Sequence, residues 1–294
     1  MVSQDSRIDR AALAIRADAI LHHAHFADAR ALFCTDVPET WLTGPFRRTL
    51  IADTSCFAIL ISIIGLDRLD PVNGASVSLL VTALERGGFA SETRIRAYIN
   101  DLQHSGAIEI VAHESDGRRR KLVPTVRLID HQRAWFAANL RALAQVFAMP
   151  FDADALGHSK GVVERYLTNV MLRHAVDHFT IFDDFPEAKS LMARRHGYIL
   201  MLELAKDGGL DVDVGRNRLA QKFGVSTAHI ATIVADAESE GWLKRNAQSS
   251  IVTLDRVFAD RLNLWVAREL ALLAMWVEPR FCTPQTAGIQ KNSH

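Results

Sequence analysis

Two segments of the chain, one starting near residue 91 and the other near residue 226, follow the same residue pattern. This internal repeat constrains the fold more than any other feature. When Ser91 is aligned with Ser226, apolar residues fall on apolar residues, and a glycine follows each serine by 15 residues without a gap. The aligned pairs are Ile95 with Ile230, Ile99 with Val234, Asp101 with Asp236, Gly106 with Gly241 and Ile108 with Leu243. The repeat predicts two copies of one unit, which we place at residues 1–148 and 149–294.

Two shorter matches lie further upstream. Leu21–Ala24 resembles Leu172–Ala175, and Val37–Glu39 resembles Phe185–Glu187. Because their offset along the chain differs from that of the serine pair, we expect the first copy to carry a short insertion before its serine.

The residues after Ser91 are typical of a capped amphipathic helix. A serine side chain can accept a hydrogen bond from a free amide of the first turn. Apolar residues then recur at helical spacing, namely Ile95, Ile99 and Leu102. Gly106 can adopt the left-handed conformation that often ends a helix, and a shorter amphipathic pattern over residues 77–84 precedes the serine. The pattern predicts a helix-turn-helix at about 76–106 and, in the second copy, at about 215–241.

A segment typical of a β-hairpin follows each helix pair. In the first copy, Ile108–Val111 alternates like a strand, Ser115–Gly117 is a turn, and Arg118–Val123 can return as the second strand. We therefore predict a wing at about 107–124 and a second wing at about 242–254. Long helices are expected near residues 5–33, 126–147, 157–180 and 255–276.

The segment Asp116–Thr125, followed by a helix, resembles the wing of the multiple-antibiotic-resistance regulator (MarR) family. The resemblance covers residues 50–147 well and residues 194–276 at the level of pattern. It implies a mainly α-helical fold with small β-wings, in which two winged-helix domains related by internal duplication are joined by long dimerisation-type helices. Subunits of that family are about as long as half of this chain. The resemblance therefore implies an intramolecular pseudo-dimer, with further self-association left open.

The resemblance also implies double-stranded DNA as the partner and raises the question of a small-molecule effector. The second copy departs from the family pattern, since its turn at Asn246–Ser250 is short and lacks the acidic-arginine wing tip. Symmetric contact of the two copies with DNA is therefore in doubt.

The residues expected to contact DNA lie on the outward face of each second helix and on the first wing. A helix in the major groove shows its N-terminal outward side chains to base edges. In the first copy these are Ser91, Thr93, Arg94, Arg96 and Asn100. Arginine can pair with guanine, and asparagine with adenine. The wing adds four adjacent bases suited to phosphates or a narrow minor groove, Arg118, Arg119, Arg120 and Lys121.

The corresponding residues of the second copy are Thr227, His229 and Thr232, a short and nearly uncharged set. Two interpretations stay open for them. They contact phosphates and thymine methyl groups, or they belong to a degenerate copy kept for structure.

Charge and composition limit the function classes. The chain has 34 basic and 34 acidic residues and no net charge, which argues against nucleic-acid binding unless the bases cluster. Its three widely spaced cysteines match neither a disulfide framework nor a zinc site. The most apolar run, Phe57–Leu66, is too short to cross a bilayer and predicts a buried helix. Because the N-terminus does not resemble a signal peptide, we expect a cytoplasmic protein that does not contact membranes.

No residue pattern indicates catalysis, a cofactor or a metal. His22, His23 and His25 are close in sequence, but no cysteine or carboxylate pattern completes a metal site. No phosphate-binding glycine loop or nucleophile motif is found. Five aromatic residues of the long helices are interpreted as core or inter-copy packing, with a small-molecule pocket as the alternative. They are Trp135, Phe136, Phe147, Trp265 and Trp276.

The sequence therefore predicts a DNA-binding transcriptional regulator that is not an enzyme and acts chiefly through the first recognition helix and its basic wing. One alternative is a winged-helix protein-interaction scaffold, which the zero net charge and the plain second wing favour. The other is a tandem winged-helix replication initiator, which would bind an array of repeated sites.

Overall fold

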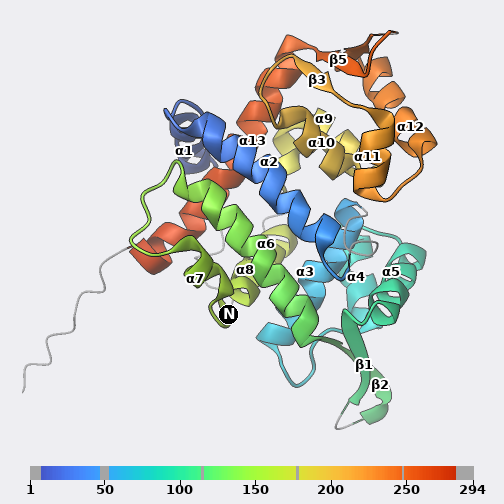
Figure 1. The fold of residues 1–294 in the computed structure, drawn as a ribbon. Helices are drawn as coiled ribbons and strands as arrows, with labels where there is room; N and C mark the ends of the chain where they lie inside the picture. The colour runs from blue at the N-terminus through green and yellow to red at the C-terminus, as the bar shows by residue number, and fades with distance from the viewer. Residues whose placement is uncertain (1–7, 47–52, 114–115, 177–178, 247, 283–294) are drawn as a thin grey trace, which may run out of the picture.

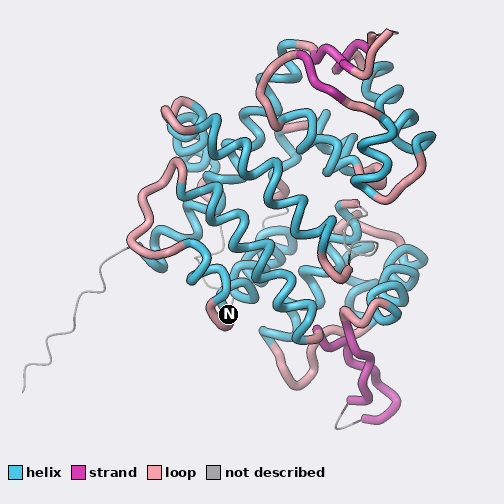
Figure 2. Tube along the Cα trace, in the orientation of Figure 1, coloured by secondary structure: helices cyan, strands magenta, loops and turns pink. Residues whose placement is uncertain are grey.

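A computed structural model describes residues 8–46, 53–113, 116–176, 179–246 and 248–282 of the chain. Over these residues the protein is mainly α-helical and carries two small antiparallel sheets (Figure 2). The predicted fold class is thus confirmed at this level. Within the described residues, no helix combines the length and the apolar character needed to span a membrane.

The first half runs from α1 to α6. Its elements are α1 (Arg10–Leu21), α2 (Phe26–Thr43), α3 (Thr54–Leu69), α4 (Val77–Arg86), α5 (Glu92–His104), β1 (Ile108–His113), β2 (Asp116–Pro124) and α6 (Val126–Ala144). The second half runs from α7 to the end of the described chain. Its elements are α7 (Ala153–His158), α8 (Val162–Val176), η2 (Ile181–Asp184), α9 (Pro186–Met192), α10 (Gly197–Ala205), β3 (Asp211–Asp213), α11 (Arg216–Phe223), α12 (Thr227–Ser239), β4 (Leu243–Arg245), β5 (Ile251–Leu254), α13 (Arg256–Val277) and η3 (Glu278–Cys282).

The two serines of the repeat cap equivalent helices. The Ser91 hydroxyl accepts a hydrogen bond from the Arg94 amide at 3.4 Å, and the Ser226 hydroxyl accepts one from the His229 amide at 3.1 Å. Each cap opens a helix of 13 residues, α5 or α12. Gly106 and Gly241 follow these helices with φ of 73° and 77°, a conformation that glycine adopts without strain. The repeat in sequence is therefore a repeat in local structure.

The same order of elements surrounds both capped helices. A buried helix comes first, α3 or α10, then a short extended segment, the helix pair, a hairpin and a long helix. The extended segment pairs with the returning strand in each half, through the Ala75–Leu122 bridge in the first half and the Val212–Val252 pair in the second. Both predicted helix pairs and both predicted hairpins are present. The third strand of the second sheet, β3, was not predicted.

The shorter upstream matches do not share a structure. Pro38 lies inside the continuous helix α2, whereas Pro186 opens the short helix α9 after a 3-10 turn. The helix expected at 5–33 is divided into α1 and α2, and the helix expected at 157–180 corresponds to the end of α7 and to α8. Similar tripeptides here adopt different local conformations, because their longer surroundings differ.

The two halves interlock through their long helices. α1 packs against α13, and α3 packs against α8, so each half contributes helices to the other. Aromatic rings from α6, α8 and α13 meet in the interior: the Phe136 and Tyr166 centroids are 4.8 Å apart, and those of Tyr166 and Trp276 are 5.2 Å apart. Such large side chains each stabilise a fold by roughly 1.5–3 kcal/mol when they are fully buried.

Helix α3 contains the apolar run that the sequence singled out. Its isoleucines Ile59, Ile61 and Ile63 are almost fully buried, as expected for a helix enclosed on all sides. Gly65 allows close packing on α8, because a Cβ at this position would lie 2.7 Å from the Met171 sulfur. The predicted buried helix is confirmed.

Candidate nucleic-acid interface and interior cavity

The helices α5 and α12 lie on the same side of the molecule. Figure 1 shows both at the right of the view, while α2, α6 and α13 lie further to the left. The β1–β2 hairpin and the sheet containing β3 and β5 lie at opposite ends of the same view. In this view the two predicted recognition helices therefore lie on one side of the molecule, with the predicted wings toward its two ends.

Four of the five α5 residues expected at DNA are exposed. They are Ser91, Thr93, Arg96 and Asn100. The Arg96 guanidinium forms an ion pair with Glu92 one turn earlier, at 2.6 Å. Exposed pairs of this kind contribute little to stability. Arg96 therefore remains accessible to a ligand at little energetic cost.

Arg94 does not project outward with them. Its guanidinium turns back to α3, where it lies 2.6 Å from the Asp53 carboxylate and 3.1 Å from the Cys56 sulfur. The Asp53 side chain is 14% exposed and that of Arg94 is 39% exposed, so the carboxylate is largely shielded from water and the guanidinium only in part. The expectation that Arg94 belongs to the outward set is wrong, because a partner on α3 holds it as a contact between α5 and α3.

The basic wing is smaller than its sequence indicates. Arg119 and Arg120 are exposed neighbours in β2, next to an irregularity in its pairing with β1. Lys121 instead reaches back to α3, with its ammonium 3.0 Å from the Asp67 carboxylate and its side chain 14% exposed. The Lys121 ammonium is thus held in an ion pair between β2 and α3 and does not extend into solvent as a DNA contact would. The side chain of Arg118 lies outside the described residues.

The α12 residues show a mixed arrangement. Thr227 and Thr232 are exposed, and the Thr232 hydroxyl donates to the Ala228 carbonyl oxygen of its own helix at 3.0 Å. His229 turns toward the chain before α10, with Nε2 3.0 Å from the Arg195 carbonyl oxygen. The outward face of α12 therefore offers small hydroxyl and methyl groups and little charge.

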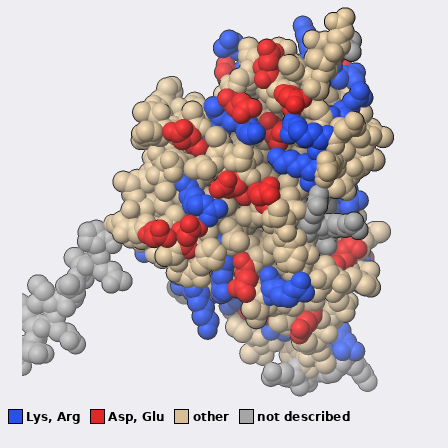
Figure 3. Space-filling view, viewed as in Figure 1, with Lys and Arg blue, Asp and Glu red and all other residues tan. Residues whose placement is uncertain are grey.

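Bases near the second helix pair are largely neutralised within the protein. Arg218 and Lys222 of α11 both contact the buried Glu203 carboxylate, each at 2.8 Å. Burial alone would raise the pKa of Glu203, but hydrogen bonds from Lys222 and Arg218 hold that pKa below its ordinary value. Figure 3 shows basic and acidic side chains interspersed over the face seen in Figure 1. This face does not carry a field of one sign.

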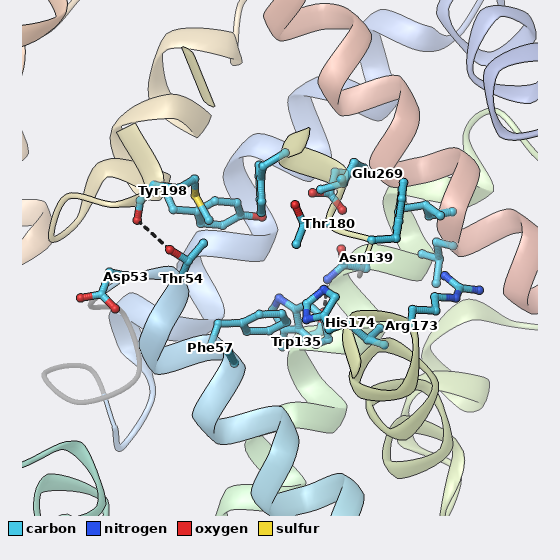
Figure 4. A pocket seen from close by; sticks show the side chains of 18 of the residues that line it. Asp53, Thr54, Phe57, Trp135, Asn139, Arg173, His174, Thr180, Tyr198 and Glu269 are labelled. Atoms are coloured by element: carbon cyan, nitrogen blue, oxygen red, sulfur yellow. Dashed lines mark hydrogen bonds between the residues drawn. The ribbon is translucent and has the colours of Figure 1, made fainter. Parts of the chain in front are cut away.

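An interior cavity of about 160 Å³ lies where the two halves meet (Figure 4). Helices α2, α3, α6, α8, α10 and α13 all contribute side chains to its wall. The wall is rich in aromatic rings, among them Trp41, Phe57, Trp135, Tyr166 and Tyr198. The rings of Trp41 and Trp135 stack with an interplanar angle of 12° and centroids 6.2 Å apart. Of the five aromatic residues singled out in the sequence, Trp135 borders this cavity, while Phe136 and Trp276 lie in the core.

Polar groups interrupt the aromatic wall. Glu269 of α13 borders the cavity and accepts a hydrogen bond from the Trp265 indole N–H at 3.2 Å. Burial raises the pKa of Glu269 to about 7, and the indole hydrogen bond offsets only part of that effect. The indole N–H of Trp135 is buried and has no hydrogen-bond partner among the described residues.

The cavity wall contacts the segments that carry α5 and α12. Phe89, in the turn between α4 and α5, stacks on His174 of α8 with ring centroids 5.6 Å apart. His196, before α10, meets His229 of α12 edge to face at 5.5 Å. Burial lowers the pKa of His174 and of His196 to about 4, with a smaller contribution from a neighbouring arginine in each case. Both histidines are therefore neutral near pH 7.

Sequence reasoning missed Glu269 as a cavity residue. A signal was present, because Glu269 follows the buried Trp265 by one helical turn and precedes the buried Leu273 by another. An acid within an apolar helix stripe is expensive to bury and therefore indicates a site. His22 and His25 instead lie exposed beside Asp18 and Asp28. No cluster of three or more potential metal ligands occurs within the described residues.

Comparison of the chain with protein-family models, with curated proteins and with solved structures finds no match. The MarR resemblance stays a prediction from the sequence. A function for this chain must therefore be inferred from its own residues.

Proposed function

We propose that this protein is a DNA-binding transcriptional regulator built from two winged-helix units that arose by duplication within one chain. The similar order of elements around α5 and α12, and the matching serine caps and glycines, support this proposal. The interlocked long helices take the place of a dimer interface. The two units thus form an intramolecular pseudo-dimer.

The observation that carries the proposal is the exposed α5 face beside an arginine-bearing hairpin. Thr93, Arg96 and Asn100 are accessible on this helix, and Arg119 and Arg120 are accessible on the hairpin. Arginine and asparagine are suited to guanine and adenine edges in the major groove. The hairpin arginines are suited to phosphates or to the minor groove. The first unit thus supplies both kinds of contact.

The second unit makes a smaller contribution. The exposed Thr227 hydroxyl can donate to a phosphate, and the methyl groups of Thr227 and Thr232 can contact thymine methyl groups. Its nearby bases Arg218 and Lys222 are already paired with Glu203. We therefore propose an unequal pair, in which the first unit reads the sequence and the second steadies the complex.

Titration of labelled genomic DNA fragments, followed by mapping of the bound sites, tests this function. Arg96→Ala and Asn100→Ala should each weaken binding to the mapped site by roughly 5- to 100-fold, because each removes a base contact of about 1–3 kcal/mol. The double substitution Arg119→Ala with Arg120→Ala should weaken binding to every duplex and reduce its salt dependence.

Lys160→Ala is the matched control, since it removes an exposed base in the loop between α7 and α8. This variant should bind as the wild type does. If the α5 and hairpin variants also bind as the wild type does, the proposed interface is wrong.

A protein-interaction scaffold is the second candidate, and the internal pairing of the bases on α11 favours it. The two functions differ in their response to salt, because DNA binding releases counterions from each neutralised phosphate. Weak DNA binding that hardly changes between low and high salt would support the scaffold. A steep loss of affinity with salt would support DNA binding.

A further inference from the structure

The interior cavity combines aromatic walls with a carboxyl group that has no basic ion-pair partner in the part of the chain that the structure describes. Two carboxylates border it among the described residues, Asp53 and Glu269. Asp53 is paired with Arg94, whereas Glu269 forms no ion pair with a described base and accepts its hydrogen bond from Trp265. An ionised carboxylate in such surroundings is costly unless a cation accompanies it.

Aromatic rings line the same cavity as Glu269. The centroid of the Tyr198 ring lies 5.5 Å from that of Trp41 and 5.8 Å from that of Trp265. Tyr166 adds its ring from α8, 6.2 Å from that of Trp135. The faces of such rings carry partial negative charge and attract cations. The walls and the acid therefore attract the same kind of group.

We infer that the cavity is a binding site for a small organic cation, whose ammonium group pairs with Glu269 and whose apolar body is enclosed by the surrounding aromatic rings. The volume of the cavity limits the size of the ligand, because a cavity of about 150 Å³ in a protein interior can hold one benzene molecule. At about 160 Å³, this cavity suits a single-ring amine. The site stands independently of the proposed DNA binding.

The basic residues of the wall do not take the place of such a ligand. Burial keeps His174 and His196 neutral by lowering the pKa of each to about 4. In Figure 4 the side chain of Arg173 extends away from Tyr198 and Phe57, toward the edge of the cavity. The wall therefore holds neutral imidazoles and amide or hydroxyl groups beside the aromatic rings and the acid.

The pH dependence of binding offers a test that needs no variant. The other titratable or charged groups at the cavity wall are Asp53, Tyr166, Arg173, His174, His196 and Tyr198. Burial raises the pKa of both tyrosines and lowers that of both histidines, so none of these four changes charge between about pH 6 and 8. The pKa of Glu269, about 7, lies within that window. Affinity for an amine should therefore rise from pH 6 to pH 8 as Glu269 ionises.

Calorimetric titration of the full chain with three probes at pH 8 tests the inference. The probes are benzylamine, benzyl alcohol and benzoate, which share one ring and differ in charge. Benzylamine should bind at least about tenfold more tightly than the alcohol, and benzoate should bind least, because a desolvated acid beside aromatic faces discriminates by charge. Equal affinities for amine and alcohol, or preference for benzoate, would overturn the inference, as would no binding of any probe.

Glu269→Gln keeps the shape of the side chain and removes its charge. This variant should lose the preference for benzylamine and its pH dependence while still binding benzyl alcohol, which shows that the cavity has remained intact. Asp260→Asn is the matched control, since it removes an exposed carboxylate of the same helix. It should bind all three probes as the wild type does. Undiminished benzylamine binding by Glu269→Gln would contradict the role of Glu269.

Discussion

At the scale of single residues, Glu269 shows how burial changes a side chain. Its carboxyl group lies among aromatic rings, where the charged form loses hydration, so its pKa is raised to about 7. In the unfolded chain the same group titrates near 4.5. The folded state therefore holds this proton more tightly. The contribution of the protonated Glu269 to the free energy of unfolding is fully present below about pH 4.5 and is lost as the pH rises through about 7.

Glu269→Gln should therefore stabilise the protein at high pH. At pH 8 the wild type must ionise a partly buried acid and the variant does not, so we expect the variant to be more stable by up to about 3 kcal/mol. Near pH 5 the two should differ little. Urea unfolding at both pH values measures the difference. Asp260→Asn should show no such pH dependence, and a gap for Glu269→Gln that does not widen with pH would contradict the assigned pKa.

What the sequence could predict at this scale depends on how far a residue's partners lie along the chain. The caps at Ser91 and Ser226 were predictable, because a cap acts on amides two or three residues away. The inward turns of Arg94 and Lys121 were not, because their partners Asp53 and Asp67 belong to another helix or its start. Sequence periodicity assigns a basic residue to the exposed face of a helix, and only the tertiary structure shows that an acidic partner holds it elsewhere.

At the scale of elements, the serine caps give a direct test of the repeat. Ser91→Ala and Ser226→Ala should each lower the free energy of unfolding by about 1 kcal/mol, because each removes the acceptor for a helix-start amide. Ser239→Ala is the control, since Ser239 lies exposed at the last residue of α12. Urea unfolding measures all three variants. If either cap variant matches Ser239→Ala, its serine does not stabilise its helix.

The helix pairs and hairpins were predictable from periodicity and turn residues, since each is determined by neighbours in sequence. Strand β3 was not, because it has only three residues and exists by pairing with β5 about 40 positions later. The sequence pattern also did not predict that the 180–192 region divides into η2 and α9. Short elements of this kind are stabilised by tertiary pairing and not by local preference.

At the scale of the whole molecule, the interlocked helices predict one cooperative unit. Residues 1–148 alone would lose α13 as the partner of α1 and α8 as the partner of α3. We therefore expect this fragment not to fold stably, and the full chain to unfold in a single transition. Circular dichroism and tryptophan fluorescence, followed together in urea, should give coincident curves. Separate transitions, or a fragment with a native-like melting curve, would show that the halves fold independently.

The repeat in sequence indicated two copies but not how they combine. The cavity is assembled from helices of both halves, and its acid comes from α13 while its stacked tryptophans come from α2 and α6. No single stretch of sequence therefore contained the site. Predicting it required knowing which helix faces meet.

The packing of α1 on α13 and of α3 on α8 also changes how this protein responds to dilution. Two separate subunits dissociate when their concentration falls below the dissociation constant of the pair. Halves joined by one chain instead experience a fixed effective concentration. The spacing of α5 and α12 should therefore be the same in a cell with a handful of copies as in a concentrated solution.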